Sequence, residues 1–219
     1  MTMTAKPTPP VHPSATEPRV VLHGIGWDTY EKLLDDLGGS RVRLTYDRGT
    51  LEIMSPSFEH DDIAEAFTLL INYMATELGI RYLPKGSTTF RKKAKQRGLE
   101  PDRCYYFDNR QAIAFKKRYE PEIDPPPDLV VEIEATNPVT IDRMAIYADL
   151  GVPEVWRFDR ERLTVWGLAD GRYEARERSP IFPMIPPEGL VPFLLRSRGE
   201  ATLDWAPDFL AWVRGCLQA

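Results

Sequence analysis

The chain has 219 residues, of which 42% are hydrophobic and 28% are charged, which is the composition of a globular protein with a full hydrophobic core. Its formal net charge of −5 argues against nucleic-acid binding by the surface as a whole but leaves room for a local basic groove. No apolar run approaches the roughly 20 residues that a membrane span needs, so no membrane partner is expected. Cys104 and Cys216 are far apart and predict neither a disulfide framework nor a zinc site, so a cytoplasmic location is the default expectation.

The first 18 residues hold five prolines and almost no large apolar residues. They lack the basic start and the apolar stretch of a secretory signal. We therefore expect residues 1–18 to form a flexible proline-rich tail and residues 19–219 to form one domain.

The elements after the tail begin with a helix that Asp28 caps and that ends at Leu37, before two glycines. Residues 41–46 and 50–54 alternate apolar and polar side chains around a turn, which predicts a β-hairpin. A long helix is expected from about Glu59 to Leu78, because its apolar residues recur at helical spacing.

Beyond the long helix the pattern predicts short strands, a compact helix at 141–150 and an amphipathic C-terminal helix at 207–217. The expected strands are 81–83, 87–90, 104–107, 129–133, 154–158, 163–167 and 173–178. Residues 136–138 are expected to form a turn, and the proline-rich segment 180–192 a loop. This order of elements is typical of a mixed α/β or α+β domain.

Two clusters of basic residues could form a local groove for an anionic partner. The first is Arg91, Lys92, Lys93, Lys95 and Arg97, and the second is Lys116, Lys117 and Arg118. The alternative is that both are loops whose charges are simply solvated.

Acidic residues lie directly beside two segments that should be buried. Asp102 precedes a short aromatic strand, and Glu132 and Glu134 close the apolar run 129–131. Because a lone carboxylate is costly among apolar residues, this placement favours a function for Glu132. With 33 acids in the chain such pairs also arise by chance, and a solvent-facing residue or an ion pair with an arginine remains the alternative.

Pairing of the two strands would bring Asp102 beside Glu132. Two carboxylates about 4 Å apart repel each other by about 4 kcal/mol at an effective dielectric near 20, and a divalent cation removes that repulsion. Hard oxygen ligands favour Mg²⁺ or Mn²⁺ over zinc. Such an ion can activate a water and polarise a phosphodiester oxygen.

Several segments of the chain, taken together and in order, match one known family. They are Leu51 to Pro56 with His60, Gly86 to Thr89, Gly98 to Asp102, Pro127 to Glu132, and Tyr147 with Gly151 to Trp156. The chain resembles the restriction-endonuclease family labelled Uma-two, a branch of the PD-(D/E)XK nuclease superfamily. The resemblance implies a four-stranded mixed sheet flanked by helices, with a metal at the strand ends. It makes Asp102 the aspartate of the PD half and Glu132 the first acid of the (D/E)XK half.

The chain departs from the superfamily pattern at the lysine. Glu134 occupies the usual lysine position, two residues after the acid, and it could be a further metal ligand or a hydrogen-bond acceptor. The family often moves the lysine to the following helix, where this chain has Arg143. Arg143 could bind the scissile phosphate bidentately, but its pKa above about 12 makes it a poor base. The alternative is an ion pair of Arg143 with Glu132, Glu134 or Asp142 that holds the helix to the sheet without a metal.

The beginning of the long helix offers further polar residues for the site. His60, with an ordinary pKa near 6.5, could bind phosphate or shuttle a proton, or it could be a capping or packing residue. Nuclease folds of this type often recruit an acid from this helix, and Glu59, Asp62 and Glu65 are equivalent choices from the sequence.

The leading hypothesis is a magnesium-dependent hydrolase that cleaves DNA, with DNA as the substrate resting on the resemblance. Asp102 and Glu132 would hold the metal, Glu134 would support it and Arg143 would contact phosphate. The metal site requires that the two carboxylates converge and that Arg143 does not fill the space between them. The alternative is a binding or assembly module that has the nuclease fold but weak or no catalytic activity. A third hypothesis is a metal-dependent hydrolase of small phosphoesters. A homodimer is expected from the aromatic C-terminal segment and from the resemblance.

Overall fold

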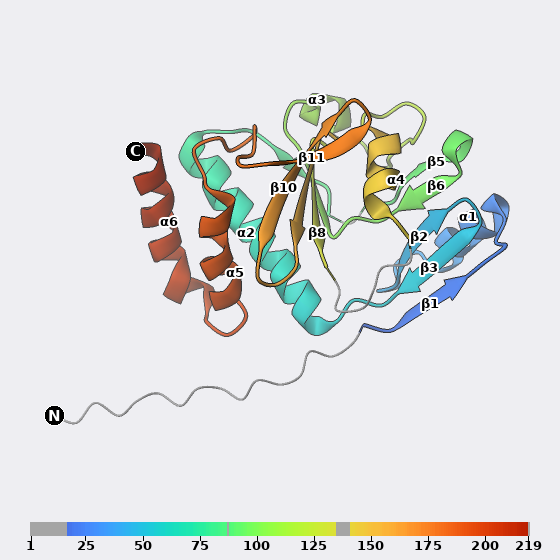
Figure 1. Cartoon of the computed structure of the whole chain (residues 1–219), viewed down its shortest axis with the longest axis horizontal. Coiled ribbons are helices and arrows are strands. Elements are labelled where there is room, and N and C mark those ends of the chain that lie inside the picture. The colour runs from blue at the N-terminus through green and yellow to red at the C-terminus, as the bar shows by residue number, and fades with distance from the viewer. Residues whose placement is uncertain (1–16, 87, 135–140, 219) are drawn as a thin grey trace, which may run out of the picture.

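The computed structural model describes residues 17–86, 88–134 and 141–218. These residues form two β-sheets that lie side by side, with three helices covering the outer face of the larger sheet (Figure 1). The predicted turn at 136–138 and Ser87, the first residue of the strand expected at 87–90, lie outside the described residues. No helix in the described ranges is both long enough and apolar enough to cross a bilayer.

The smaller sheet has five antiparallel strands in the order β1-β3-β2-β6-β5. The strands are β1 (Arg19–Leu22), β2 (Arg43–Asp47), β3 (Thr50–Met54), β5 (Phe90–Lys92) and β6 (Arg97–Leu99), and the helix α1 (Trp27–Asp36) packs against them. The predicted hairpin is β2–β3. Its two-residue turn has positive φ at both Arg48 (46°) and Gly49 (93°), which is the turn geometry that matches strand twist.

The larger sheet has six strands in the order β11-β10-β9-β8-β7-β4, and only the β8–β9 pair is parallel. The strands are β4 (Leu83–Pro84), β7 (Arg103–Tyr106), β8 (Leu129–Ile133), β9 (Glu154–Phe158), β10 (Leu163–Ala169) and β11 (Arg172–Arg176). The expected mixed α/β fold is confirmed, but the expectation of a four-stranded sheet is wrong. The larger sheet has two strands more than expected, and β1, β2, β3, β5 and β6 form a second sheet.

Helices cover both faces of the larger sheet, and both faces are apolar. The long α2 (Phe58–Leu78) begins at the N-cap Ser57 and ends at Gly79 in the left-handed conformation, close to the predicted bounds. It packs on the sheet together with α5 (Val191–Arg196) and α6 (Thr202–Gln218), while α4 (Arg143–Leu150) covers the opposite face. Two 3₁₀ turns and a short helix complete the fold: η1 (Lys93–Lys95), η2 (Pro187–Leu190) and α3 (Arg110–Ile113).

Strand β8 separates the two apolar cores. Leu129, Val131 and Ile133 pack in the core beneath α2, and Val130 packs in the core beneath α4. Because side chains alternate along a strand, Glu132 shares the face of Val130 and points toward α4. The buried position of Glu132 therefore follows from a strand that is covered on both faces.

The fold corrects two expectations from the sequence and removes one of the two grounds for a third. The first basic cluster is not a solvated loop, because its residues belong to β5, η1 and β6, and Arg97 is buried. Segment 180–192 is not simply a loop, because η2 lies within it and α5 begins in it. The apolar face of α6 packs in the core of its own chain through Phe209 and Val213, so the aromatic C-terminal segment no longer argues for a dimer, which stays a prediction.

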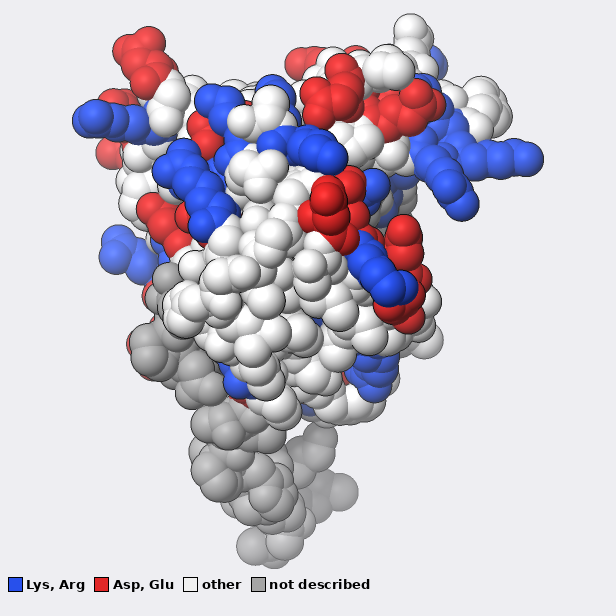
Figure 2. Space-filling view, turned by 90° about the vertical axis from the view of Figure 1, so that its right-hand side faces the viewer, with Lys and Arg blue, Asp and Glu red and all other residues white. Residues whose placement is uncertain are grey.

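Figure 2 shows the side of the molecule formed by the smaller sheet. Charged side chains of both signs gather along the upper part of this face, and its lower part carries few charges. No single sign of charge dominates the face, in agreement with the modest net charge of −5.

Candidate active site

The antiparallel pairing of β7 and β8 brings the two sequence-predicted acids together. In the register of this pair Arg103 faces Val131, so the preceding Asp102 lies next to Glu132. The backbone N–H of Ile133 donates to Asp102 Oδ2 at 2.6 Å, which fixes the aspartate against the end of β8. Both acids are buried, at 1% and 7% exposure.

Asp102 is held by two cationic or ionisable side chains. His60 of α2 places its Nε2 2.8 Å from Asp102 Oδ1, and Arg43 of β2 forms an ion pair with the same oxygen. The guanidinium of Arg43 also lies 3.3 Å from His60 Nε2. Burial lowers the pKa of Arg43, and Glu132 opposes that effect. The carboxylate of Asp102 is thus engaged on both oxygens.

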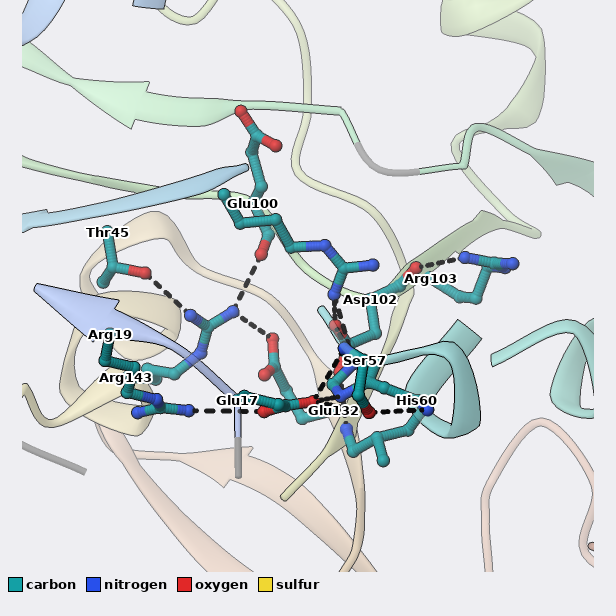
Figure 3. Close-up of polar contacts among 12 residues, drawn as sticks. Glu17, Arg19, Thr45, Ser57, His60, Glu100, Asp102, Arg103, Glu132 and Arg143 are labelled. Atoms are coloured by element: carbon teal, nitrogen blue, oxygen red, sulfur yellow. Dashed lines mark hydrogen bonds and ion pairs between the residues drawn. The ribbon is translucent and has the colours of Figure 1, made fainter. Parts of the chain in front are cut away.

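The other nitrogen of His60 faces a residue that the sequence analysis assigned to the tail. His60 Nδ1 lies 2.7 Å from Glu17 Oε1, and Glu17 is only 1% exposed (Figure 3). Ser57 joins the two, because its Oγ accepts from the backbone N–H of His60 and donates to Glu17. Burial tends to raise the pKa of Glu17, but His60, Ser57 and Arg19 outweigh it, so the pKa is lowered. The C-terminal end of the predicted tail is therefore part of the packed structure.

Glu132 is held from helix α4. Arg143 Nη2 donates to Glu132 Oε1 at 2.8 Å, and the hydroxyl of Tyr147 donates to the same oxygen. Arg143 also donates to Thr45 Oγ1 at 2.7 Å and to the Glu100 carbonyl at 2.8 Å, so one guanidinium joins α4 to both sheets (Figure 3). Burial and the Glu132 carboxylate raise the pKa of Tyr147. The ion pair between Arg143 and Glu132, one of the alternatives from the sequence, is present.

The two acids border one cavity of about 300 Å³. Its lining residues are Arg19, Met54, Asp102, Glu132, Ile133, Glu134, Ile141, Asp142, Arg143, Met144 and Arg157. Within the part of the chain that the structure describes, Arg143 Nε is buried and has no hydrogen-bond acceptor. A buried donor without an acceptor is costly, so the guanidinium of Arg143 is not fully satisfied by its present partners.

Of the remaining predicted site residues, Glu134 lines the cavity and the first-helix acids do not. Glu134 lines the cavity but pairs with Arg157 of β9 at 2.6 Å, and both side chains are about one-third exposed. Of the first-helix acids, Glu59 pairs with Arg160 and Arg198, and Glu65 pairs with Arg103. Glu59, Asp62 and Glu65 are not among the described residues that line the cavity.

The donor set fits a divalent cation that takes few protein ligands. Asp102 and Glu132 supply hard carboxylate oxygens at one cavity, which suits Mg²⁺ or Mn²⁺. Over the described ranges no group of three or more His, Cys, Asp or Glu side chains is arranged to hold a metal. Magnesium commonly keeps several waters and takes one or two carboxylates, so two acids suffice. Arg43 and Arg143 already neutralise these acids, and a cation must replace part of those contacts.

Arg43, Thr45 and Glu17 are site residues that the sequence analysis missed, and Tyr147 was noted only as part of a motif. Arg43 and Thr45 alternate with apolar residues along β2, which normally marks a solvent-facing side. That side instead faces the space between the two sheets, where α4 covers it. The spacing of Tyr147 four residues after Arg143, on one helix face, is the signal that could have found it.

The fold and the buried acid pair define a restriction-endonuclease-like mixed α/β protein. The model of the Uma2 family, described as "Putative restriction endonuclease", matches residues 27–196, and the chain belongs to this family. A comparison with curated proteins finds no match.

A solved structure shows the same fold. It is the crystal structure of a putative nuclease of the DUF820 group from Anabaena variabilis ATCC 29413, which is 15% identical in sequence with a TM-score of 0.50. The match covers 69% of this chain and 90% of that one. At this identity the likeness concerns the fold and not the chemistry.

Proposed function

We propose that the chain is a Mg²⁺- or Mn²⁺-dependent endonuclease that hydrolyses phosphodiester bonds of DNA. The observation that carries the proposal is the pair Asp102 and Glu132 at one cavity, which Arg143 also lines. Membership of the Uma2 family supports nucleic acid as the substrate class.

In this proposal Asp102 and Glu132 are the metal ligands, and a bound ion would lower the pKa of a water and polarise the phosphodiester. Arg143 lines the cavity and would bind a phosphate oxygen there in exchange for one of its present acceptors, because a guanidinium stays protonated and donates in a fixed planar geometry. Tyr147 orients Glu132, and His60 and Arg43 orient Asp102. Glu134 supports the site from the rim, where it can accept a hydrogen bond from a water held there.

Arginine pairing of both acids has a consequence for cation binding. A divalent ion competes with Arg43 at Asp102 and with Arg143 at Glu132. Phosphate oxygens would give these guanidiniums an alternative partner, so we expect the ion and the DNA to bind more tightly together than separately.

A non-catalytic nuclease-fold module is the second candidate. It is favoured by the same ion pairs, which satisfy both acids without a metal, and by Glu134 at the usual lysine position. A homodimer stays a prediction, which sedimentation of the purified chain would check.

A plasmid-cleavage assay separates the two candidates. The parent, Asp102→Asn, Glu132→Gln and the matched control Glu188→Gln, an exposed acid on η2, are incubated with supercoiled DNA and Mg²⁺ or Mn²⁺. The proposal predicts nicking by the parent and the control, loss in both site variants and loss on chelation. Cleavage that survives in both folded site variants, or no cleavage by the parent with either ion, would contradict it.

A further inference from the structure

The segment after α3 exposes an aromatic side chain that packing does not explain. Phe115 is fully exposed, at 102%, and its backbone lies in the left-handed region with φ of 64°. Exposure forgoes the burial that normally stabilises phenylalanine, and the left-handed region is unfavourable for a bulky residue. Such an outlier, observed in the structure, is a reason to look for a function.

The neighbouring residues hold this part of the chain in place. The backbone N–H of Ala114 donates to the Arg110 carbonyl at 2.9 Å, and that of Lys116 donates to the Ile113 carbonyl at 3.2 Å. The ammonium of Lys116 forms an ion pair with Asp124. Phe115 therefore lies between two residues whose backbones are held by hydrogen bonds. Binding of a partner then costs little conformational entropy for ordering this segment.

The charges around Phe115 are basic and available. Lys117 and Arg118 are exposed, and with Lys85 they border a small cavity of about 100 Å³. Across the described residues, none of these three side chains has an acidic partner within ion-pair distance, whereas Lys116 is neutralised by Asp124 and Glu120. This is the second of the two basic clusters noted in the sequence.

We propose that residues 114–118 form a contact for single-stranded nucleic acid, in which Phe115 stacks on a base while Lys117 and Arg118 bind the adjacent phosphates. A ring with both faces open stacks on any base, and cations beside it match the charge of the backbone. The choice of nucleic acid rests on the proposed function.

The position of the contact fits a strand that extends from the candidate active site. The backbone N–H groups of Phe107 and Asn109, just before α3, donate to the side chain of Asp128, just before β8. The segment that leads into α3 therefore lies at the N-terminal end of β8, whereas Glu132 lies near the C-terminal end of that strand. Asp128 and Glu132 are four residues apart, which is roughly 13 Å along an extended strand. The contact is thus a holding point for DNA outside the cleavage position.

The test is fluorescence anisotropy of a labelled single strand and of the matching blunt duplex, in chelator so that cleavage does not interfere. The variants of the full chain are Phe115→Ala, Phe115→Trp and the double variant Lys117→Ala with Arg118→Ala. Leu203→Ala, at an exposed apolar position on α6, and Lys32→Ala, at an exposed lysine on α1, are the matched controls.

Loss of the ring in Phe115→Ala should weaken single-strand binding by about 5- to 150-fold, with a much smaller effect on the duplex. Phe115→Trp should retain the affinity, and the double variant should weaken binding to both ligands and flatten its salt dependence. The proposal is overturned if the parent does not bind the single strand or if Phe115→Ala matches Leu203→Ala.

These outcomes are separate from those of the plasmid assay. If the single strand binds in a way that depends on the Phe115 ring but no cleavage occurs, the proposed contact stands and the proposed endonuclease activity is refuted. If cleavage requires Asp102 and Glu132 but does not depend on Phe115, the proposed endonuclease activity stands and the proposed contact is refuted.

Discussion

Arg143 joins helix α4 to both sheets, so its replacement tests the assembly of the site without any substrate. Arg143→Met removes the bonds to Glu132, Thr45 and Glu100 together. The side chains of Arg143 and Glu132 are only 15% and 10% exposed, so solvent screens the pair little. Breaking one side of a buried ion pair costs about 3–5 kcal/mol, because the remaining charge is left without its partner.

Arg143→Lys should cost about 1–2 kcal/mol, since the ammonium can still pair with Glu132 but loses the planar set of donors. The matched control is Arg157→Met, which breaks the more exposed pair with Glu134 at the same cavity and should cost at most about 1 kcal/mol. The assay is urea unfolding followed by tryptophan fluorescence. A free energy of unfolding for Arg143→Met within about 1 kcal/mol of the parent would refute the reasoning.

Three further changes test neighbouring contacts. Tyr147→Phe removes the hydroxyl that donates to Glu132 and should lower the free energy of unfolding by about 1.5–3 kcal/mol in the same urea assay; an unchanged midpoint would show that the bond contributes nothing. Arg97→Met removes the buried guanidinium that bonds Asp47 and Asp149, which keep Arg48 and Lys95 as partners, and should cost about 1.5–3 kcal/mol, with calorimetry as the check and an unshifted transition as the contrary result. Burial raises the pKa of Glu154, so its carboxyl favours the folded state at low pH and loses that effect as pH rises through the raised pKa. Glu154→Gln should therefore unfold at a higher temperature than the parent in alkaline buffer, with a smaller difference in acid; the opposite order would contradict the assigned direction.

The strongly patterned elements could be predicted from the sequence. The bounds of β8 and β9 agree with the expected strands at every residue, and α2 differs by one residue at its start. These segments bury apolar side chains at a clear period, which is the signal that sequence reveals best. The two acids were found for the same reason, because each borders such a strand.

The contacts of those acids could not be predicted, because they come from residues far away in the chain. Arg97 looks like surface charge in the sequence but is buried, since Asp47 and Asp149 approach it from β2 and α4. Helix α5 was missed because Pro192 suggested a loop, although proline is well tolerated in the first turn of a helix. Glu17 lies next to a proline-rich segment whose composition predicted a tail, and only its packing against His60 shows otherwise.

Calorimetric titration of Mn²⁺ into the metal-free chain tests the central claim most directly, which is that Asp102 and Glu132 together hold a divalent ion. The parent, Asp102→Asn and Glu132→Gln are compared after circular dichroism has shown that all three are folded, each with and without a phosphorothioate duplex. The account predicts one site in the parent, tighter in the presence of the duplex, and no site in either variant. Equal Mn²⁺ binding by the parent and both variants, or no binding by the parent even with the duplex, would contradict it.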